Sequence, residues 1–349
     1  MRKIGIGERL VGNGERVFII AEVGVNHDGD VALAKRLVDE AADAGADAVK
    51  FQTFRAERLA SARAPKAPYQ LRTTDRAESQ LEMLRRLELS PDAHREVQRQ
   101  CMKRAIAFVS TPFDEGSADL LEELDVPVFK IGSGEITNWS FLEYVARKGK
   151  PIILSTGMSF LSEVDEAVRI IRRAGCEQLV LLHCVSSYPA DPADANLLAM
   201  QTMATAFGVP VGFSDHTRGI EVSLAAVALG ASVIEKHFTL DRNMPGPDHQ
   251  ASLEPEELVA LVRGIRTVER SLGDGRKKPA LAEAEAAAAS RRSLVATRDI
   301  PAGVLLTEEL IGVRRPGTGL PPAMRSYLLG RRTRMVIPAG ALFELEMLL

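Results

Sequence analysis

The sequence is poor in cysteine, has no long apolar run and carries almost no net charge. Three cysteines in 349 residues give no basis for a disulfide framework, so we expect a reducing, cytoplasmic compartment. The N-terminal stretch MRKIGIGERLVG lacks an uninterrupted apolar core, and we therefore expect no signal peptide. No apolar run is long enough to span a bilayer, which argues against a membrane partner. A net charge of −3 argues against nucleic acid as the main partner.

The small net charge hides an uneven distribution. Residues 291–349 hold nine arginines, no lysine and five acidic residues, a charge of +4, so the rest of the chain carries −7. A basic C-terminal segment is suited to docking on an acidic surface or to binding an anion. The alternative is a solvated arginine surface without a partner.

Eight short apolar runs are the main feature that is present. They cover residues 17–21, 48–49, 105–109, 126–129, 152–154, 179–182, 209–213 and 231–234. A polar residue of a kind that takes part in catalysis follows each run, in the order Glu22, Lys50 with Gln52, Thr111, Lys130 with Ser133, Ser155, His183, His216 and His237. Segments with helical periodicity separate the runs, and the first of these helices is capped by Asp30 and ended by Gly45.

This alternation of strands and helices predicts an α/β fold with a parallel sheet. Polar residues after all eight runs favour closure into a (β/α)₈ TIM barrel with the site at its C-terminal face. A doubly wound open sheet is the rival fold. It usually has a glycine-rich phosphate loop after its first strand, and the segment EVGVNH at 22–27 is not such a loop.

Two long segments fall outside the regular alternation. Residues 56–90 are many for a strand-to-helix connection, so we expect a lid or a wall of the site, with a plain surface excursion as the alternative. After residue 275 the composition changes, which predicts a barrel domain at 1–275, a helical linker at 276–292 and a small β-rich domain at 293–349.

The small domain carries an internal repeat. The segment IPAGVL at 300–305 recurs loosely as IPAGAL at 337–342, which predicts approximate internal symmetry. A domain of this size buries only a modest core by itself, so we expect it to pack on another surface.

Two histidines are candidate metal ligands. His216 and His237 follow neighbouring strands, so we expect their imidazoles to converge above the barrel. Two neutral imidazoles suit a divalent transition metal and leave positions open for water and substrate. Asp248, in the loop after the eighth strand, is placed to orient a metal-bound water or a sugar hydroxyl. Structural or acid–base histidines are the alternative.

Two lysines are candidate anion ligands. Lys50 and Lys130 lie where apolar neighbours predict burial, and a buried ammonium needs a counter-charge. Together they predict a bound dianion such as a phosphate or phosphonate. Hydroxyl groups after three neighbouring strands would complete the site: Thr111, Ser133 and Ser155. The alternative is that the lysines pair with Glu22 and Glu135.

The remaining candidates surround these groups. Gln52 lies two residues from Lys50 and therefore faces the same side of its strand. Glu22 is a candidate to position a water or to act as general base. Three further residues are candidates for substrate contacts: Glu135 to sugar hydroxyls, Tyr188 as a wall of the pocket, and Arg315 to an acyl or carboxylate group.

These motifs resemble the sialic acid (nonulosonic acid) synthases over nearly the whole chain. The similar stretches are IAEVGVNH at 20–27, VKFQTF at 49–54, STPFD at 110–114, KIGSGE at 130–135, LSTGM at 154–158, SDHT at 214–217, EKHFTLD at 235–241 and GPD at 246–248. The domain from residue 293, including RRPGTG at 314–319, resembles the SAF (antifreeze-like) domain of these enzymes.

The resemblance implies a reaction and its cofactor. Phosphoenolpyruvate condenses with open-chain N-acetylmannosamine, phosphate leaves with cleavage of the C–O bond of phosphoenolpyruvate, and N-acetylneuraminate results. The family resemblance implies Mn²⁺, or alternatively Mg²⁺ or Co²⁺. It also implies a homodimer in which the SAF domain of one chain caps the barrel of the other.

The resemblance also assigns roles to the candidate residues. His216 and His237 become metal ligands, and Glu22 orients the water or the tetrahedral intermediate. The phosphoenolpyruvate site is then Lys50, Thr111, Lys130, Ser133 and Ser155. The sugar contacts are then Gln52, Glu135, Tyr188 and Asp248, with Arg315 reaching the N-acyl group from the partner chain.

Several readings stay open. N-acetylmannosamine is placed first as acceptor, ahead of its 6-phosphate and of 2,4-diacetamido-2,4,6-trideoxymannose, which would give N,N'-diacetyllegionaminate. Ser186 stands where some neuraminate synthases have Asn, and His183 stands where the pseudaminate branch usually has Lys. From other classes, a Schiff-base aldolase using Lys50 or Lys130 and a non-catalytic sugar-binding protein remain.

Overall fold

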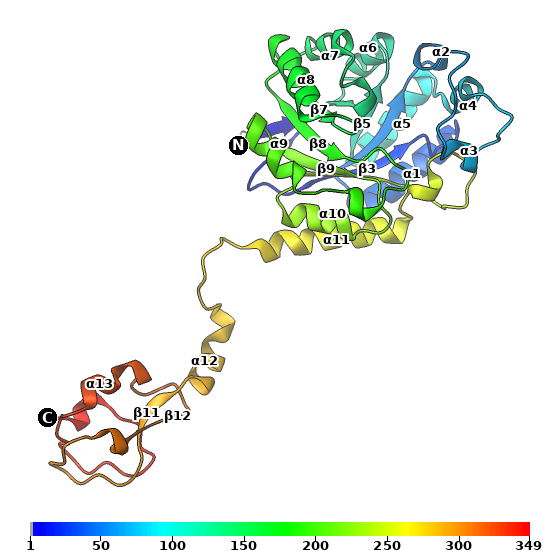
Figure 1. Cartoon of the computed structure of the whole chain (residues 1–349). Helices are drawn as coiled ribbons and strands as arrows, with labels where there is room; N and C mark the ends of the chain where they lie inside the picture. Colours follow the sequence, from blue (N-terminus) through cyan, green and yellow to red (C-terminus); the bar gives the residue numbers. More distant parts are fainter. Residues whose placement is uncertain (1–2) are drawn as a thin grey trace. The chain divides into compact units, whose positions relative to one another are not determined.

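Eight parallel strands close into a barrel in the computed structural model, which describes residues 3–349 apart from the Arg72 side chain (Figure 1). In chain order the strands are β3 (Phe18–Gly24), β4 (Ala48–Thr53), β5 (Ala107–Pro112), β6 (Phe129–Ile131), β7 (Ile152–Ser155), β8 (Leu179–Cys184), β9 (Val211–Asp215) and β10 (Val233–His237). Strand β10 pairs in parallel with β3 and completes the closure. The predicted (β/α)₈ barrel is therefore confirmed, and the doubly wound alternative is wrong.

Several strands run further toward their carboxyl ends than the apolar runs predict. Strand β4 continues to Thr53, beyond the run at 48–49, and β10 ends at His237 rather than at 234. At the other end, Ala105 has a positive φ of 51° and precedes β5. Many of the polar residues thus belong to the strands themselves, so their side chains follow the strand alternation.

Helices connect the strands of the barrel. They are α1 (Val31–Asp43), α2 (Ala56–Leu59), α3 (Gln70–Thr73), α4 (Gln80–Leu87), α5 (Pro91–Lys103), α6 (Glu115–Glu123), α7 (Trp139–Ala146), α8 (Leu161–Arg173), α9 (Ala199–Phe207), α10 (Glu221–Ala228) and α11 (Pro255–Leu272), with 3₁₀ turns η1 (Ser133–Glu135), η2 (Pro192–Asp194) and η3 (His249–Ala251). Asp30 caps α1 as predicted, because its side chain accepts a hydrogen bond from the Ala32 N–H. Within residues 3–349, no helix is long and apolar enough to cross a membrane.

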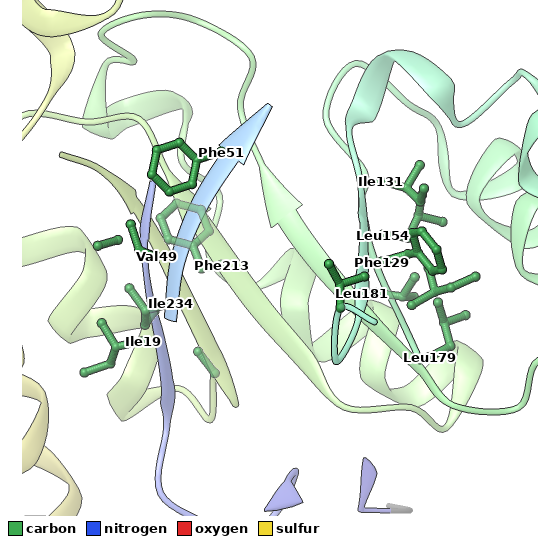
Figure 2. Packing of buried hydrophobic residues seen from close by; sticks show 14 of the residues in the cluster. Ile19, Val49, Phe51, Phe129, Ile131, Leu154, Leu179, Leu181, Phe213 and Ile234 are labelled. Atoms are coloured by element: carbon green, nitrogen blue, oxygen red, sulfur yellow. The ribbon is translucent and has the colours of Figure 1, made fainter. Parts of the chain in front are cut away.

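The barrel has two apolar layers, one on each side of its strands. The outward-facing layer packs between strands and helices, and Figure 2 shows part of it: Ile19, Val49, Phe51, Phe213 and Ile234 in one group, and Phe129, Ile131, Leu154, Leu179 and Leu181 in another. The inward-facing layer includes Phe18, Ile20, Val109 and Val233. It packs against a hairpin of β1 (Ile4–Ile6) and β2 (Arg9–Val11) that the sequence did not predict and that closes the N-terminal end of the barrel.

The second compact unit is Asp274–Leu349. Its elements are η4 (Leu281–Glu283), α12 (Ala284–Ser290), β11 (Ser293–Ala296), η5 (Glu308–Leu310), β12 (Ile311–Arg314), η6 (Pro322–Met324), α13 (Arg325–Leu328) and η7 (Leu345–Met347). Ile300 and Ile337, which begin the two copies of the repeat, exchange backbone hydrogen bonds of 2.8 Å in both directions. Both side chains are buried in the core of this unit, so the two copies face each other across it.

We expect His27, in the loop after β3, to make the barrel acid-sensitive. Its side chain is fully buried, its Nδ1 accepts a hydrogen bond from the Gly29 N–H at 3.0 Å, and burial lowers its pKa to about 4. In the unfolded chain the pKa of a histidine is near 6.5, so between pH 6.5 and 4 the unfolded chain binds a proton that the folded chain does not. The free energy of unfolding therefore decreases as the pH is lowered through this range. Urea unfolding at pH 7 and pH 5 tests this. His27→Asn should remove about 2 kcal/mol of the difference, and an equal difference in both proteins would contradict it.

Candidate active site

The carboxyl ends of the barrel strands surround a cavity of about 340 Å³. All eight strands, or the loops that follow them, contribute to its lining. The predicted site residues that line it are Glu22, Lys50, Gln52, Thr111, Lys130, Ser133, Ser155, Tyr188, His216, His237 and Asp248. Three other cavities in the described chain are larger, about 400, 490 and 630 Å³, but none of these residues lines them, so side-chain chemistry rather than size marks the site.

Strand alternation determines which side chains reach the cavity. Lys50 and Gln52 both line it from β4, whereas Phe51 between them is in the outward-facing layer. Glu235 and Ser214 also line the cavity, although neither is among the residues predicted from the sequence. Each lies two residues before a predicted histidine and so faces the same way, which is the signal that would have found them.

A buried cluster of two lysines and two glutamates occupies one part of the cavity. Lys50 Nζ lies 2.7 Å from Glu22 Oε2 and 3.7 Å from Glu235 Oε2, and Lys130 Nζ lies 3.4 Å from Glu235 Oε1. Lys50 also donates a hydrogen bond to Thr111 Oγ1 at 3.2 Å. The alternative that the lysines pair with Glu22 and Glu135 is correct for Glu22, but the carboxylate beside Lys130 is that of Glu235, because it projects inward from β10.

Burial and neighbouring charges separate the pKa values of the two glutamates. Burial raises the pKa of Glu22 to about 7, although Lys50 opposes the shift. Burial would also raise the pKa of Glu235, but Lys130 and Lys50 outweigh it and lower the pKa to about 2. With one carboxylate ionised and the other titrating near neutrality, the two ammonium groups leave the cavity short of negative charge. The cluster therefore favours an anionic ligand.

The two predicted metal ligands lie together at the same cavity. The ring centroids of His216 and His237 are 5.5 Å apart, and the Tyr188 ring lies 4.3 Å from the first and 5.6 Å from the second. His216 Nδ1 contacts the Val185 carbonyl oxygen at 2.7 Å, so the proton resides on Nδ1 and Nε2 is free to accept. Burial lowers the pKa of both imidazoles, and that of His237 falls well below its usual range.

These properties fit a divalent cation held by two protein ligands. Neutral imidazoles are the form that binds metal, and a hydrogen bond from the other ring nitrogen to a backbone carbonyl is the usual support. The buried Nδ1 of His237 has no hydrogen-bond partner. Among the described residues, no group of three or more His, Cys, Asp or Glu is placed to hold a metal, so water and substrate would have to complete the coordination.

Asp248 and the long segment 56–90 form another side of the cavity. Burial raises the pKa of Asp248 to about 6, and its Oδ1 has no hydrogen-bond partner. The segment contributes Tyr69, Gln70, Met83, Leu84 and Leu87 to the lining, and Thr73 Oγ1 donates to the Pro247 carbonyl at 3.2 Å. The prediction that this segment is a wall of the site is thereby confirmed.

Three polar residues that the sequence analysis considered lie elsewhere. Glu135 does not line the cavity, and its carboxylate accepts a hydrogen bond from Asn138 Nδ2 at 2.7 Å. His183 faces away from the cavity and contacts the Ala195 carbonyl at 2.8 Å, because Leu182 and Cys184 occupy the inward positions of β8. Arg315 is exposed in the second unit, so its predicted role stays a prediction.

Comparison with protein families gives the class of the enzyme. The model of the NeuB family matches residues 37–277, and the model of the SAF domain matches residues 291–349. The chain belongs to the NeuB family. The resemblance to sialic acid synthases is confirmed, and this NeuB-family member is a synthase enzyme of the sialic (nonulosonic) acid class.

Relatives of this NeuB-family enzyme are named for different nonulosonic acid products. It is 51% identical to the N,N'-diacetyllegionaminic acid synthase of Campylobacter jejuni, over 91% of this chain and 96% of the relative. It is 48% identical to the synthase of the same name from Legionella pneumophila, over 97% and 96%. The crystal structure of N-acetylneuraminic acid (sialic acid) synthetase from Leptospira borgpetersenii, in complex with citrate, superposes with a TM-score of 0.73 at 39% identity, covering 82% of this chain and 95% of that one.

Proposed function

We propose that this enzyme condenses phosphoenolpyruvate with the open-chain aldehyde of an N-acetylmannosamine-type sugar. A new C–C bond joins C3 of phosphoenolpyruvate to C1 of the sugar, and water adds at C2. The bond between C2 and the oxygen that bridges to phosphorus then breaks, so phosphate leaves with that oxygen and C2 becomes a ketone. The observation that carries this proposal is one buried cavity containing both an anion-favouring lysine pair and a pair of neutral imidazoles. The reaction needs cationic groups that bind the phosphate and carboxylate of the donor, and a separate group that withdraws electrons from the aldehyde oxygen of the acceptor.

The donor site is the lysine side of the cavity. Lys50 and Lys130 bind the negative charges of phosphoenolpyruvate, and hydroxyl groups on the neighbouring strand ends orient it: Thr111, Ser133 and Ser155. Glu22, whose pKa lies near neutrality, holds the attacking water and takes its proton. That proton passes to the former aldehyde oxygen, which becomes a hydroxyl group, and the proton of the new C2 hydroxyl leaves with the phosphate as the ketone forms.

The acceptor site is the histidine side. His216 and His237 would hold Mn²⁺, or Mg²⁺ or Co²⁺ in its place, and the cation would polarise the aldehyde oxygen as a Lewis acid. Tyr188 packs against both imidazoles and limits the space for the sugar. Gln52 and Asp248 present hydrogen-bonding groups to the sugar hydroxyls.

We place 2,4-diacetamido-2,4,6-trideoxymannose ahead of N-acetylmannosamine as the acceptor. The relatives at 51% and 48% identity are named for the legionaminic acid product, whereas the structure named for N-acetylneuraminic acid is 39% identical. The sequence motifs are common to both kinds of enzyme and do not separate the two acceptors, so this order replaces the one given in the sequence analysis, where N-acetylmannosamine is first. The product is then N,N'-diacetyllegionaminate.

Exposed apolar side chains in the segments that follow β6 and β7 support a partner that covers this end of the barrel. Trp139, Met158 and Phe160 follow β6 and β7 and are 54%, 72% and 79% exposed in the described chain, and Met158 also lines the cavity. We propose a homodimer in which the SAF domain of one chain covers the barrel of the other and brings Arg315 to the N-acyl group. Within the SAF unit, the loop that carries Arg315 is fixed by a hydrogen bond of 2.7 Å from Ser293 Oγ to the Pro316 carbonyl.

Phosphate release with three acceptors tests the proposed function. We expect turnover with phosphoenolpyruvate and Mn²⁺, and a kcat/KM at least about tenfold higher for the 2,4-diacetamido sugar than for N-acetylmannosamine or its 6-phosphate. A higher value for N-acetylmannosamine would overturn only the choice of acceptor. No phosphate release with any acceptor would overturn the synthase proposal, and a borohydride-trapped adduct on Lys50 or Lys130 would replace it with a Schiff-base mechanism.

Gly157→Ala should weaken the donor site. The Gly157 N–H donates to Ser133 Oγ at 2.9 Å, and a Cβ added there would lie 2.9 Å from that oxygen, 2.8 Å from Cys184 Sγ and closer still to Ser186 Oγ. Since Ser133 must move, we expect KM for phosphoenolpyruvate to rise by about tenfold, the effect of 1–2 kcal/mol of overpacking. Gly134→Ala is the matched control, because it lines the same cavity and its Cβ would meet no atom within 4 Å. Equal KM values for the two variants would contradict the assignment of Ser133.

A further inference from the structure

An ion pair lies directly behind the two histidines, on the helix side of the barrel wall. Lys236 Nζ lies 2.8 Å from Asp215 Oδ2, and the two side chains are 1% and 0% exposed. Asp215 precedes His216 and Lys236 precedes His237, so strand alternation directs this pair outward where the imidazoles point inward. Phe213 and Ile234 occupy the outward positions that precede the pair on the two strands.

The Asp215 carboxylate is the centre of a fully buried hydrogen-bond network. Its Oδ1 accepts from the N–H of Thr217 at 2.8 Å and from Thr217 Oγ1 at 2.7 Å, and its Oδ2 accepts from Ser223 Oγ at 2.6 Å. Lys236 donates a second bond, of 2.6 Å, to the Thr217 carbonyl. The residues on both sides of His216 are therefore tied to the residue before His237.

This network starts where the backbone pairing of the two strands ends. The β9–β10 ladder finishes at the pair Asp215 and Lys236, so His216 and His237 lie one residue beyond it. Each strand end is held on its other side, since His237 pairs with Glu22 of β3 and the Ala190 N–H donates to the His216 carbonyl at 2.8 Å. The β9–β10 ladder does not reach the two histidines, so the Asp215–Lys236 network is a side-chain tie between their strand ends. A buried ion pair usually stabilises a fold no more than apolar residues of similar volume, so the stability of the layer does not explain its presence.

We propose that Asp215 and Lys236 are positioning residues, whose ion pair holds His216 and His237 at the separation at which both imidazoles bind one divalent cation. This inference rests on the proposed function, which makes the two imidazoles the metal ligands. Neither side chain lines the cavity, and their hydrogen bonds join each other, Thr217 and Ser223, so the pair acts through the backbone that carries the imidazoles.

The test uses the full-length protein and a double variant, Asp215→Asn with Lys236→Met. Replacing both partners leaves no unpaired buried charge, so the melting temperature of the metal-free double variant should be close to that of the metal-free wild type. We expect the Kd for Mn²⁺, measured by electron paramagnetic resonance, to rise at least about tenfold, as is usual when the support of a metal ligand is lost. We also expect kcat to fall at least about tenfold while KM for phosphoenolpyruvate stays within about threefold, because the lysine side of the cavity is intact.

Ser223→Ala is the matched control. It removes one hydrogen bond from the same carboxylate but leaves the tie between the strands, so it should lower the melting temperature and leave the Kd for Mn²⁺ within about twofold. A folded double variant that keeps both its Kd and its kcat within about twofold of wild type would overturn the proposal.

Imidazole NMR spectra of the metal-free protein separate this inference from the proposed function. The chain has six histidines, and in the double variant only the ring signals of His216 and His237 should shift strongly. If the wild type does not bind Mn²⁺, or if His237→Ala binds it equally well, the metal assignment fails and these spectra alone decide the positioning role. Unchanged ring signals would then overturn it.

Discussion

His237→Ala is expected to lower kcat by about 10³-fold or more and to abolish Mn²⁺ binding at micromolar concentration. The loss of kcat should exceed the roughly 10–100-fold loss that is typical when a residue supporting a metal ligand is replaced. The Nδ1 of His237 is a buried acceptor or donor without a protein partner, and burial keeps the imidazole neutral. A cation bound through His216 alone would lose half of its protein ligands.

The control for this variant is another strand-end histidine. His183→Gln changes an imidazole that faces away from the cavity and hydrogen-bonds to the Ala195 carbonyl, so we expect kcat within about threefold of wild type. Phosphate release in chelator-treated buffer, followed by Mn²⁺ titration, measures both variants. Full activity of His237→Ala after chelation would show that the metal assignment is wrong.

Glu22→Gln is expected to lower kcat by about 10²- to 10⁴-fold, the usual contribution of a general base. The substitution keeps the shape and the hydrogen-bonding oxygen but removes the group that takes a proton from the attacking water. Lys50 keeps Glu235 as a neighbour at 3.7 Å, so KM for phosphoenolpyruvate should change much less than kcat. A kcat within about fivefold of wild type would contradict the role of Glu22.

The same variant should be as stable as the wild type or more stable. The pKa of Glu22 is raised by burial, from near 4.5 to about 7, so the fold favours the protonated form. Ionisation of Glu22 therefore costs stability as pH rises from 4.5 through 7, and the neutral glutamine avoids this cost. The melting temperature of the variant minus that of the wild type should be larger at pH 8 than at pH 6. A loss of stability that grows with pH would mean that the Lys50 ion pair dominates.

Much of the site was predictable because it follows from strand order. The eight polar strand ends are visible in the sequence, and barrel closure brings most of them to one cavity. The missed residues Glu235 and Ser214 were within reach of the same reasoning, since period-2 alternation from His237 and His216 places them inward. His183 shows the converse, because its neighbours Leu182 and Cys184 occupy the inward positions.

Other features depended on contacts between distant segments. The carboxylate nearest Lys130 is Glu235, 105 residues away in the chain, rather than the nearby Glu135. The hairpin β1–β2 has too short a pattern to be recognised alone, and its role follows only from packing against the inward residues of the barrel. The partner of each buried charge and the covering of the barrel's N-terminal end by the hairpin depend on contacts between distant segments, so local sequence patterns do not predict them.

The sequence by itself determined the class of fold, the end of the barrel that carries the site, and the residue types available there, because periodicity and strand order are local properties of the chain. Only the tertiary structure decided which charges neutralise one another, since the pKa values of Glu22 and Glu235 diverge through burial and through the distances to Lys50 and Lys130. The tertiary structure also decided where the buried charges lie. Lys50 and Glu22 form an ion pair in the cavity, and Asp215 and Lys236 form one in the layer behind it.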